Sequence, residues 1–252
     1  MRPRAFTLIE LLVVVAVIAT LIGILLPSLA AGREAARSTR CLSALHDVGT
    51  ALQCYFNCEA DRFPLSQAHG GYQPGTAWLD TLAPHTELKL QYRCPSDRST
   101  NFDSGDPAQR RVTSYGVNVF MGPNDEDWFP DNPSGIPPFG YVVQTQLRDT
   151  SRWVYSAEIA EVAANGQPLY ADHFHAEKWG TNPFTGFGGA EPRFDLEIER
   201  HRGRSNYLFA DGHADRQRFD ELFLIDANGW MTINRFDPGF PHSPEGWYRP
   251  SD

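Results

Sequence analysis

The chain has 252 residues, of which 41% are hydrophobic, and a formal net charge of −9. This length is enough for an apolar segment plus one globular domain of roughly 190 to 220 residues. The acidic balance argues against nucleic acid as a partner, because phosphate binding needs a basic surface. Frequent glycine (21) and proline (19) favour a loop-rich domain that contains β-sheet over a helical bundle.

Residues 6–26 form an apolar run whose only charged residue is Glu10. As a helix this run is about 31 Å long, the thickness of the hydrocarbon core of a bilayer. A signal peptide cut after Ala30 and a simple membrane anchor are two possible interpretations. A carboxylate in lipid costs a few kcal/mol unless a partner neutralises it, and neither interpretation supplies that partner.

Cleavage between Ala5 and Phe6 supplies one, because it creates a positively charged α-amine on Phe6. In a bundle of such helices, Glu10 of one subunit would pair with the amine of its neighbour. The segment Phe6-Thr7-Leu8-Ile9-Glu10 and the apolar residues after it resemble the prepilin leader of type IV pilins and type II secretion pseudopilins. In that family the new terminus is usually N-methylated. Ala5 stands where the family usually has glycine.

This resemblance implies the partners and the location of the protein. The partners would be a prepilin peptidase, other pilin-like subunits and an inner-membrane assembly platform. Residues 1–5 would be the leader, and its removal takes away Arg2 and Arg4, which lowers the net charge by two, to −11. A single pass through the inner membrane would leave the N-terminus in the cytoplasm and the globular domain in the periplasm or in an extracellular fibre. Charge alone is equivocal, because Arg33, Arg37 and Arg40 follow the apolar run.

Helical spacing continues beyond the apolar run and predicts one helix over residues 6–58. Its second half is amphipathic, with apolar residues three and four apart: Leu42, Leu45, Val48, Gly49, Leu52, Tyr55 and Phe56. Pro27 should kink or loosen this helix. The fold class expected is α+β and pilin-like, with the long helix packed on a mainly antiparallel sheet domain with long loops over residues 59–252.

Four cysteines in an oxidising compartment predict at least one disulfide. Of the three possible pairings we favour Cys41 with Cys94, which leaves Cys54 and Cys58 as a local pair. That local pair forms only if the helix frays before Cys58, because i, i+4 positions in a regular helix direct their Cβ atoms badly. A zinc site is the alternative, although the chain has no Cys-x2-Cys.

The middle of the chain contains three predicted strands and two weak metal candidates. The strands fall in residues 112–121, with a bulge at Gly116, and in residues 141–147 and 152–159. Asp125 and Asp127 lie in a proline-rich loop and are oxygen donors of the type that calcium takes. His173 and His175 would share one face of a strand, as paired metal ligands do. Solvated acids and structural histidines are commoner, so we expect no metal and no cofactor, with calcium at Asp125 and Asp127 and a metal at His173 and His175 as the weak alternatives.

Residues 201–218 predict a β-hairpin. Asp211-Gly212 between alternating flanks is a strong signal for a two-residue type I′ turn. That turn would pair Phe209 with Ala214, and would place Tyr207 and Phe209 on the core side.

His201 precedes Asp211-Gly212 by the spacing His-x9-Asp-Gly, and this element supports a second resemblance. The chain is similar to a bacterial family of prepilin-like proteins of unknown function that combines this element with the leader. The similarity extends to Cys41–Leu45, Arg62–Pro64, Cys94–Asp97 and Thr113–Gly116. It implies a pseudopilin-like fold and no established activity.

Three functions follow as hypotheses. In the first, the protein is a structural subunit of a type II secretion or type IV pilus-like fibre and is not an enzyme. The second is a membrane- or fibre-anchored module that binds a ligand such as a glycan through Trp128, Phe129, Tyr141 and Trp179. The third is an anchored metal-dependent hydrolase that uses His173, His175, His201 and Asp211. An aromatic cleft would favour the second function, and convergence of the histidines would favour the third.

Overall fold

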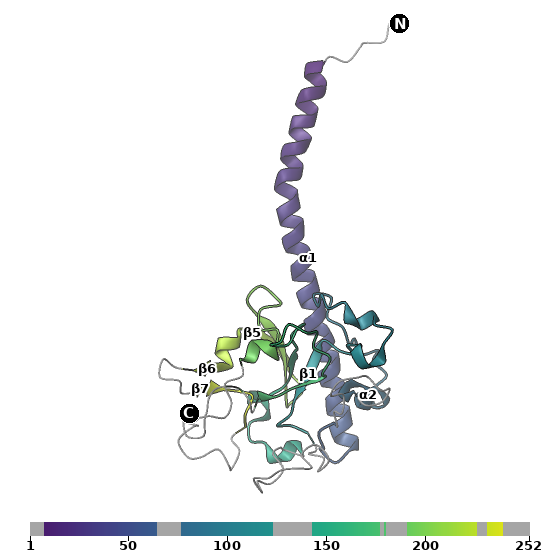
Figure 1. Cartoon of the computed structure of the whole chain (residues 1–252), viewed down its shortest axis with the longest axis vertical. Coiled ribbons are helices and arrows are strands. Elements are labelled where there is room, and N and C mark those ends of the chain that lie inside the picture. The colour runs from purple at the N-terminus through teal and green to yellow at the C-terminus, as the bar shows by residue number, and fades with distance from the viewer. Residues whose placement is uncertain are drawn as a thin grey trace.

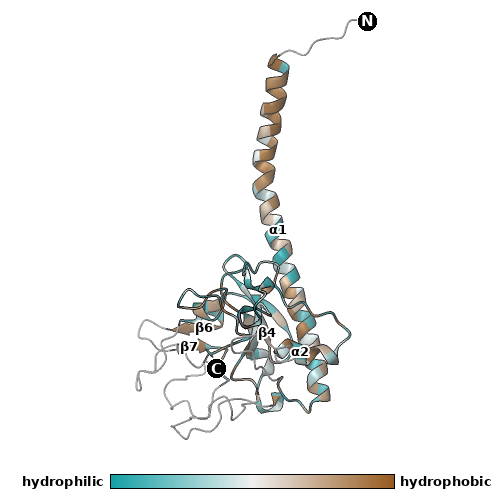
Figure 2. Cartoon of the chain, turned by 45° about the vertical axis from the view of Figure 1, so that its right-hand side comes forward, coloured by the Kyte–Doolittle hydropathy of each residue, from teal (hydrophilic) through white to brown (hydrophobic). Residues whose placement is uncertain are grey.

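The computed structural model describes residues 8–64, 77–122, 143–176, 179, 191–225 and 231–238. A single helix, α1 (Leu8–Cys58), has 51 residues and projects far beyond the globular domain (Figure 1). It continues through Pro27, and Figures 1 and 2 show a gentle curve where the sequence predicts a kink. In a helix the ring of Pro27 crowds the carbonyl of the residue four positions earlier, which is Gly23. Because glycine has no Cβ, the backbone at Gly23 can bend slightly to relieve this contact.

The second half of α1 is the spine of the domain. Its buried residues recur at the spacing of one helix face: Ser38, Cys41, Ala44, Leu45, Val48, Gly49, Ala51, Leu52 and Phe56. The helix ends after Cys58 because Ala60 and Asp61 take left-handed backbone conformations, with φ of 51° and 60°. The amide of Asp61 then donates to the carbonyl of Phe56 at 2.9 Å and closes the last turn.

A five-stranded sheet has the order β3-β1-β2-β4-β5. The strands are β1 (Tyr115–Asn118), β2 (Val154–Glu158), β3 (His173–Phe174), β4 (Ser205–Phe209) and β5 (Ala214–Gln217). All neighbours pair antiparallel except β1 and β3, which are parallel. A second, antiparallel pair is β6 (Phe223–Ile225) with β7 (Met231–Asn234). The fold is therefore α+β and pilin-like, as the sequence predicts.

One further α-helix, α2 (Trp78–Leu82), packs on α1. Short 3₁₀ turns connect the described elements: Ala83–His85, Asn101–Asp103, Pro107–Gln109, Gln144–Gln146, Thr150–Arg152, Pro192–Phe194 and Phe219–Glu221.

Hydrophobic clusters cover both faces of the sheet. On one face Leu208, Tyr155 and Tyr115 pack with the apolar face of α1 and with Trp78. On the other face Tyr207 and Phe209 pack with a cluster of aromatic residues from the C-terminal part of the chain. The central strands β2 and β4 are buried along their whole length, which explains why they carry no simple alternation of apolar and polar residues.

Two strand predictions need correction. Residues 144–146 form a 3₁₀ turn and Val143 makes an isolated bridge to Arg62, so the strand predicted over 141–147 is wrong in its described part, residues 143–147. Gly116 lies within an unbroken register, so it is not a bulge. Its missing side chain serves close packing, because a Cβ there would lie 2.5 Å from Cγ2 of Ile159.

The hairpin forms, but its turn differs from the prediction. Leu208 pairs with Ala214, one residue out of the expected register. The amide of Gly212 donates to the carbonyl of Phe209 at 2.9 Å, and Gly212 alone of the turn residues has positive φ, at 86°. This is a three-residue loop with glycine in the left-handed position, which contains one residue more than a type I′ turn. Both faces of β4 are buried, so no single core side exists.

Candidate functional site

The first candidate site is the apolar half of α1. Its large apolar residues from Leu8 to Leu29 have exposed fractions of 48% to 80%. Figure 2 shows this half as almost uniformly hydrophobic, with the polar residues beginning where the helix reaches the domain. Within the described residues, α1 is the one helix that is long and apolar enough to cross a membrane. A signal sequence can have the same length and hydropathy.

Glu10, the predicted assembly residue, lies near the tip of this half. Glu10 is exposed in the first turn of α1. Ala5 and Phe6, the residues of the predicted cleavage bond, lie outside the described residues, so their predicted role remains a prediction.

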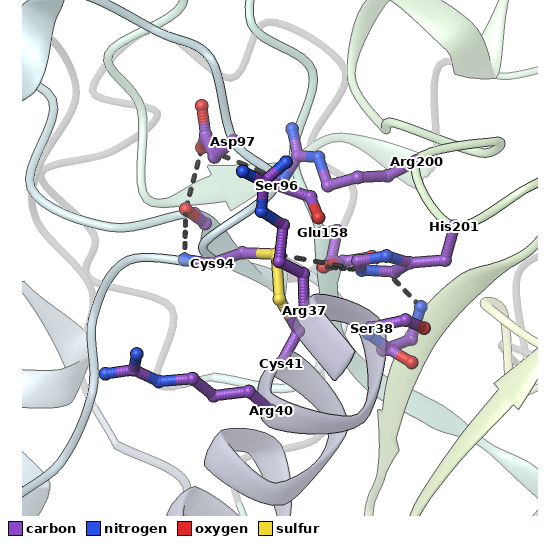
Figure 3. The surroundings of a disulfide bond; sticks show 12 residues. Arg37, Ser38, Arg40, Cys41, Cys94, Ser96, Asp97, Glu158, Arg200 and His201 are labelled. Atoms are coloured by element: carbon purple, nitrogen blue, oxygen red, sulfur yellow. Dashed lines mark hydrogen bonds and ion pairs between the residues drawn. A yellow bond between two sulfur atoms is a disulfide. The ribbon is translucent and has the colours of Figure 1, made fainter. Parts of the chain in front are cut away.

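The second candidate site is a buried polar cluster beneath the point where α1 enters the domain (Figure 3). Cys41 of α1 and Cys94 form a disulfide across 53 residues of sequence, the pairing that the sequence favours. Cys54 and Cys58 are free thiols, so the predicted local pair does not form. The physical reason is that α1 stays regular through Cys58, and a regular helix holds i, i+4 cysteines in unsuitable directions.

His201 lies against this disulfide. Its Nε2 is 3.0 Å from Oε1 of Glu158 and 3.6 Å from Sγ of Cys94. A carboxylate only accepts hydrogen bonds, so Nε2 carries the proton in this contact. Nδ1 of His201 makes no hydrogen bond within the described residues, and the nearest carboxylate oxygen to it is Oε1 of Glu34, at 3.6 Å.

Glu158 is fully buried at the end of β2 and is held by several donors. Its Oε2 accepts hydrogen bonds from the hydroxyl of Ser205 at 2.7 Å and from the amide of Asn206 at 3.1 Å. Burial raises the pKa of the Glu158 carboxyl, but the hydrogen bond from His201 and the charge of Arg200 outweigh it. The net pKa lies below the ordinary glutamate value, so Glu158 is a carboxylate at neutral pH.

Asp97 is the second buried carboxylate of the cluster. It makes an ion pair with Arg111 at 3.0 Å and accepts a hydrogen bond from the hydroxyl of Ser114 at 2.7 Å. Burial raises the pKa of Asp97, but the charges of Arg111 and Arg200 and these hydrogen bonds lower it by more. Burial also lowers the pKa of Arg111 to about 10, which still leaves the guanidinium charged at neutral pH.

A polar cavity of about 300 Å³ opens beside the cluster. Glu34 and Arg37 of α1 line one side, and Ser96 and Arg200 line another. The hydroxyl of Ser96 donates to Oε1 of Glu34 at 3.0 Å, so α1 and the turn after Cys94 are connected by a hydrogen bond as well as by the disulfide.

The other predicted site residues lie apart from this cluster or outside the described residues. Nδ1 of His173 lies 3.2 Å from Asp172, and the ring of His173 packs edge-on against His175 with centroids 5.1 Å apart. Asp211 contacts His213, so His173, His201 and Asp211 each contact different partners. The calcium candidates Asp125 and Asp127 are not among the described residues.

Of the predicted glycan contacts, only Trp179 is described. It is 2% exposed, stacks on Phe174 and donates its indole N–H to Asp195 at 2.7 Å. It is therefore a core residue and not a surface contact. Trp128, Phe129 and Tyr141 lie outside the described residues.

Comparison with known families matches residues 1–26 to the model of the prokaryotic N-terminal methylation motif. The motif and the long apolar helix that it begins are consistent with a prepilin-like protein, and they fit a membrane-anchored chain. The motif implies processing by a prepilin peptidase and assembly with other pilin-type subunits. The match ends within α1, so it does not extend to the globular domain. No curated protein and no solved structure matches the chain.

Sequence reasoning missed Glu158, Arg111 and Arg200 as members of one site. A signal was present, because Cys41, Cys94, Ser114 and His201, which belong to elements that carry the second resemblance, meet at this cluster. Cys41 and Cys94 form the disulfide, the amide of Cys94 donates to Ser114 at 2.9 Å, and His201 contacts Cys94. Glu158 and Arg200 lie in segments without a recognisable motif, and only the tertiary contacts identify them.

Proposed function

We propose that the chain is a structural, pseudopilin-like subunit that assembles through the apolar half of α1 into a type II secretion or type IV pilus-like fibre. The observation that carries this proposal is the division of one continuous helix into two halves. Residues from Leu8 to Leu29 are exposed and apolar, while residues from Ser38 to Phe56 are the spine of a packed domain.

A surface of this kind needs an apolar partner, because exposed apolar patches of this extent are rare on soluble monomers. A bilayer covers it in the single subunit, and the same half of neighbouring copies covers it in a fibre. A subunit can move from the bilayer into a fibre without rearrangement of its domain, because the contacts that bury α1 begin only near Ser38.

Cleavage between Ala5 and Phe6 by a prepilin peptidase would give each subunit a new α-amine, which is then N-methylated. We propose that Glu10 pairs with the Phe6 amine of a neighbouring subunit and so sets the register of assembly. Pairing two opposite charges offsets the loss of hydration that each suffers in an apolar bundle.

The remaining parts of the proposal concern location and partners. The helix would cross the inner membrane once, with the N-terminus in the cytoplasm and the domain in the periplasm or in an extracellular fibre. Partners would include other pilin-like subunits and the inner-membrane assembly platform. This role needs no catalytic group. The glycan-binding alternative loses support from Trp179, which is buried in the core.

Substitution Glu10→Val tests the assembly role. It removes a charge that costs about 2.5–3.5 kcal/mol at the centre of a bilayer, so insertion and cleavage should continue. It also removes the partner of the neighbouring Phe6 amine, which costs roughly 3–5 kcal/mol when a buried pair is broken. We expect cross-linked ladders of subunits in membranes to disappear, with leader cleavage retained.

Thr20→Val is the matched control, because it changes a polar residue on the same helix half without removing a charge. Its ladder should equal that of the original chain. Equal ladders for Glu10→Val and Thr20→Val would remove the assembly role of Glu10. N-terminal sequencing of the membrane-bound protein should begin at Phe6, and a start at Ala31 would instead indicate a signal peptide.

A further inference from the structure

The buried cluster contains a complete set of metal-ligating side chains. Sγ of Cys41, Sγ of Cys94, one carboxylate oxygen of Glu158 and one ring nitrogen of His201 all lie within 4.8 Å of one another, and all four residues are buried. In the present state the disulfide occupies both sulfurs. The chain has no Cys-x2-Cys, so sequence spacing does not reveal this set, which the fold brings together from four distant segments.

The surroundings hold Glu158 in the orientation of a ligand. Its Oε2 is occupied by Ser205 and Asn206, at 2.7 and 3.1 Å, which leaves Oε1 directed at His201. Outer hydrogen bonds of this kind orient carboxylate ligands in metal sites.

His201 has a carboxylate near its outer ring nitrogen. Its Nε2 faces the sulfur of Cys94 and Oε1 of Glu158, while Nδ1 makes no hydrogen bond to any described residue and lies 3.6 Å from Oε1 of Glu34. A metal on Nε2 would move the ring proton to Nδ1, and Glu34 would accept it after approaching by about half an ångström. Metal-bound histidines commonly donate their other ring N–H to a carboxylate in this manner.

The charge of the cluster permits a metal ion and two thiolates to replace the disulfide. Asp97 and Glu158 contribute two negative charges, and Arg111 and Arg200 contribute two positive ones, so the fully buried charges around the disulfide sum to zero. One Zn²⁺ and two thiolates add no net charge. The buried site therefore gains no uncompensated charge when the disulfide is replaced by a zinc dithiolate.

We propose that the dithiol form of this protein binds one Zn²⁺ through Cys41, Cys94, His201 and Glu158, so that the same four side chains hold either a disulfide or a metal. Two thiolates, one imidazole and one carboxylate in a closed, buried site suit tetrahedral zinc. The two sulfurs must separate to about 3.8 Å, the distance set by two Zn–S bonds of about 2.3 Å at a tetrahedral angle.

The dithiol form arises by two routes. A chain that folds before oxidation already has two thiols, which release two protons when Zn²⁺ binds. From the oxidised chain, a small dithiol is the reductant: by exchange it gives two electrons and two protons to the sulfurs of Cys41 and Cys94 and leaves as its own disulfide. Pro95 and Ser96, which follow Cys94 in the chain, line the polar cavity, so such a reagent can approach the buried sulfur of Cys94 from that side.

The test uses the full chain in detergent with Cys54→Ser and Cys58→Ser, so that only Cys41 and Cys94 remain as thiols. After reduction by a phosphine, which donates two electrons to the disulfide and takes an oxygen atom from water to become a phosphine oxide, Co²⁺ and then Zn²⁺ are added without oxygen. We expect one metal per chain, with thiolate-to-cobalt charge-transfer bands and the visible bands of tetrahedral cobalt. The unreduced chain should bind none.

Glu158→Gln and His201→Ala should each weaken zinc binding at least tenfold in competition with a chromophoric chelator, and His46→Ala, an exposed histidine on α1, should leave it unchanged. Circular dichroism reports folding in every sample. If the reduced chain unfolds, zinc should restore the fold, and failure to do so overturns the proposal. Absence of cobalt bands, or equal affinity in all three variants, overturns it as well.

Discussion

Gly49 of α1 and Gly212 of the hairpin turn pack backbone against backbone. A Cβ on Gly49 would overlap the carbonyl oxygen of Gly212 and would lie 2.9 Å from Cδ1 of Leu208. A Cβ on Gly212 would lie 2.9 Å from Gln53 and 3.0 Å from the carbonyl oxygen of Gly49. Each glycine therefore leaves room for the other, and together they fix where the hairpin rests on the helix.

We expect Gly49→Ala to destabilise the domain by about 1–3 kcal/mol, because the atom that the new methyl meets is backbone and cannot rotate away. Gly32→Ala is the matched control on the same helix, where nothing lies within 4 Å of the added Cβ. Alanine is the better helix former, so that control should be neutral or more stable by up to about 1 kcal/mol. Urea unfolding of the full chain in detergent measures both. A stabilising Gly49→Ala would contradict the close approach.

Gly212→Val should lower the stability of the domain while membrane insertion continues. Positive φ is unfavourable for a β-branched residue by roughly 1–3 kcal/mol, and the contacts with Gln53 and Gly49 add to that penalty. Gly166→Val is the control, since Gly166 has a φ of 75° but nothing within 4 Å of an added Cβ. Protease resistance of the folded domain compares the two. If both variants lose the same stability, the contact with α1 contributes nothing.

The native protein should contain two free thiols, Cys54 and Cys58, with Cys41 and Cys94 protected as a disulfide. Alkylation under denaturing, non-reducing conditions followed by mass measurement counts them. The bond closes a long loop, with a sequence separation of 53 residues, so the chain-entropy estimate of its stabilisation is about 4 kcal/mol. Cys41→Ser should therefore expose one additional reactive thiol and lower the unfolding midpoint. Four reactive thiols, or none, in the original chain would contradict this pairing.

Acid should unfold the domain through Asp97 and Glu158. Both carboxyls have pKa values below their ordinary ones in the folded state. The unfolded chain therefore binds more protons as the pH falls through the ordinary values near about 4, and the stability present above that pH is lost below it. Melting temperature against pH should fall steeply under about pH 4. Glu158→Gln should flatten this slope, and an unchanged slope would assign the acid sensitivity to other groups.

Elements that depend on local sequence pattern were predictable from the amino-acid sequence alone. A run of apolar residues with one carboxylate defines α1 and its exposed half, because helix length and hydropathy are properties of consecutive residues. The three- and four-residue spacing after Leu42 likewise identified the buried face of the second half. The strand of residues 152–159 and the hairpin were also predictable, since β-rich runs and an Asp-Gly turn are local signals.

Most features that depend on contacts between distant segments, apart from the Cys41–Cys94 disulfide, were not predicted from the sequence. The hairpin shifted by one residue because Gly212, and not Asp211, takes the left-handed conformation while its turn rests on Gly49. The strands β6 and β7 were not predicted, since they are short, and Phe223 of β6 belongs to a buried cluster that also contains residues of β2 and β4. The site around His201 joins α1, the turn after Cys94, β2 and the segment before β4. The contacts between these four segments form only when the segments pack together, so residue spacing within any one segment does not reveal them.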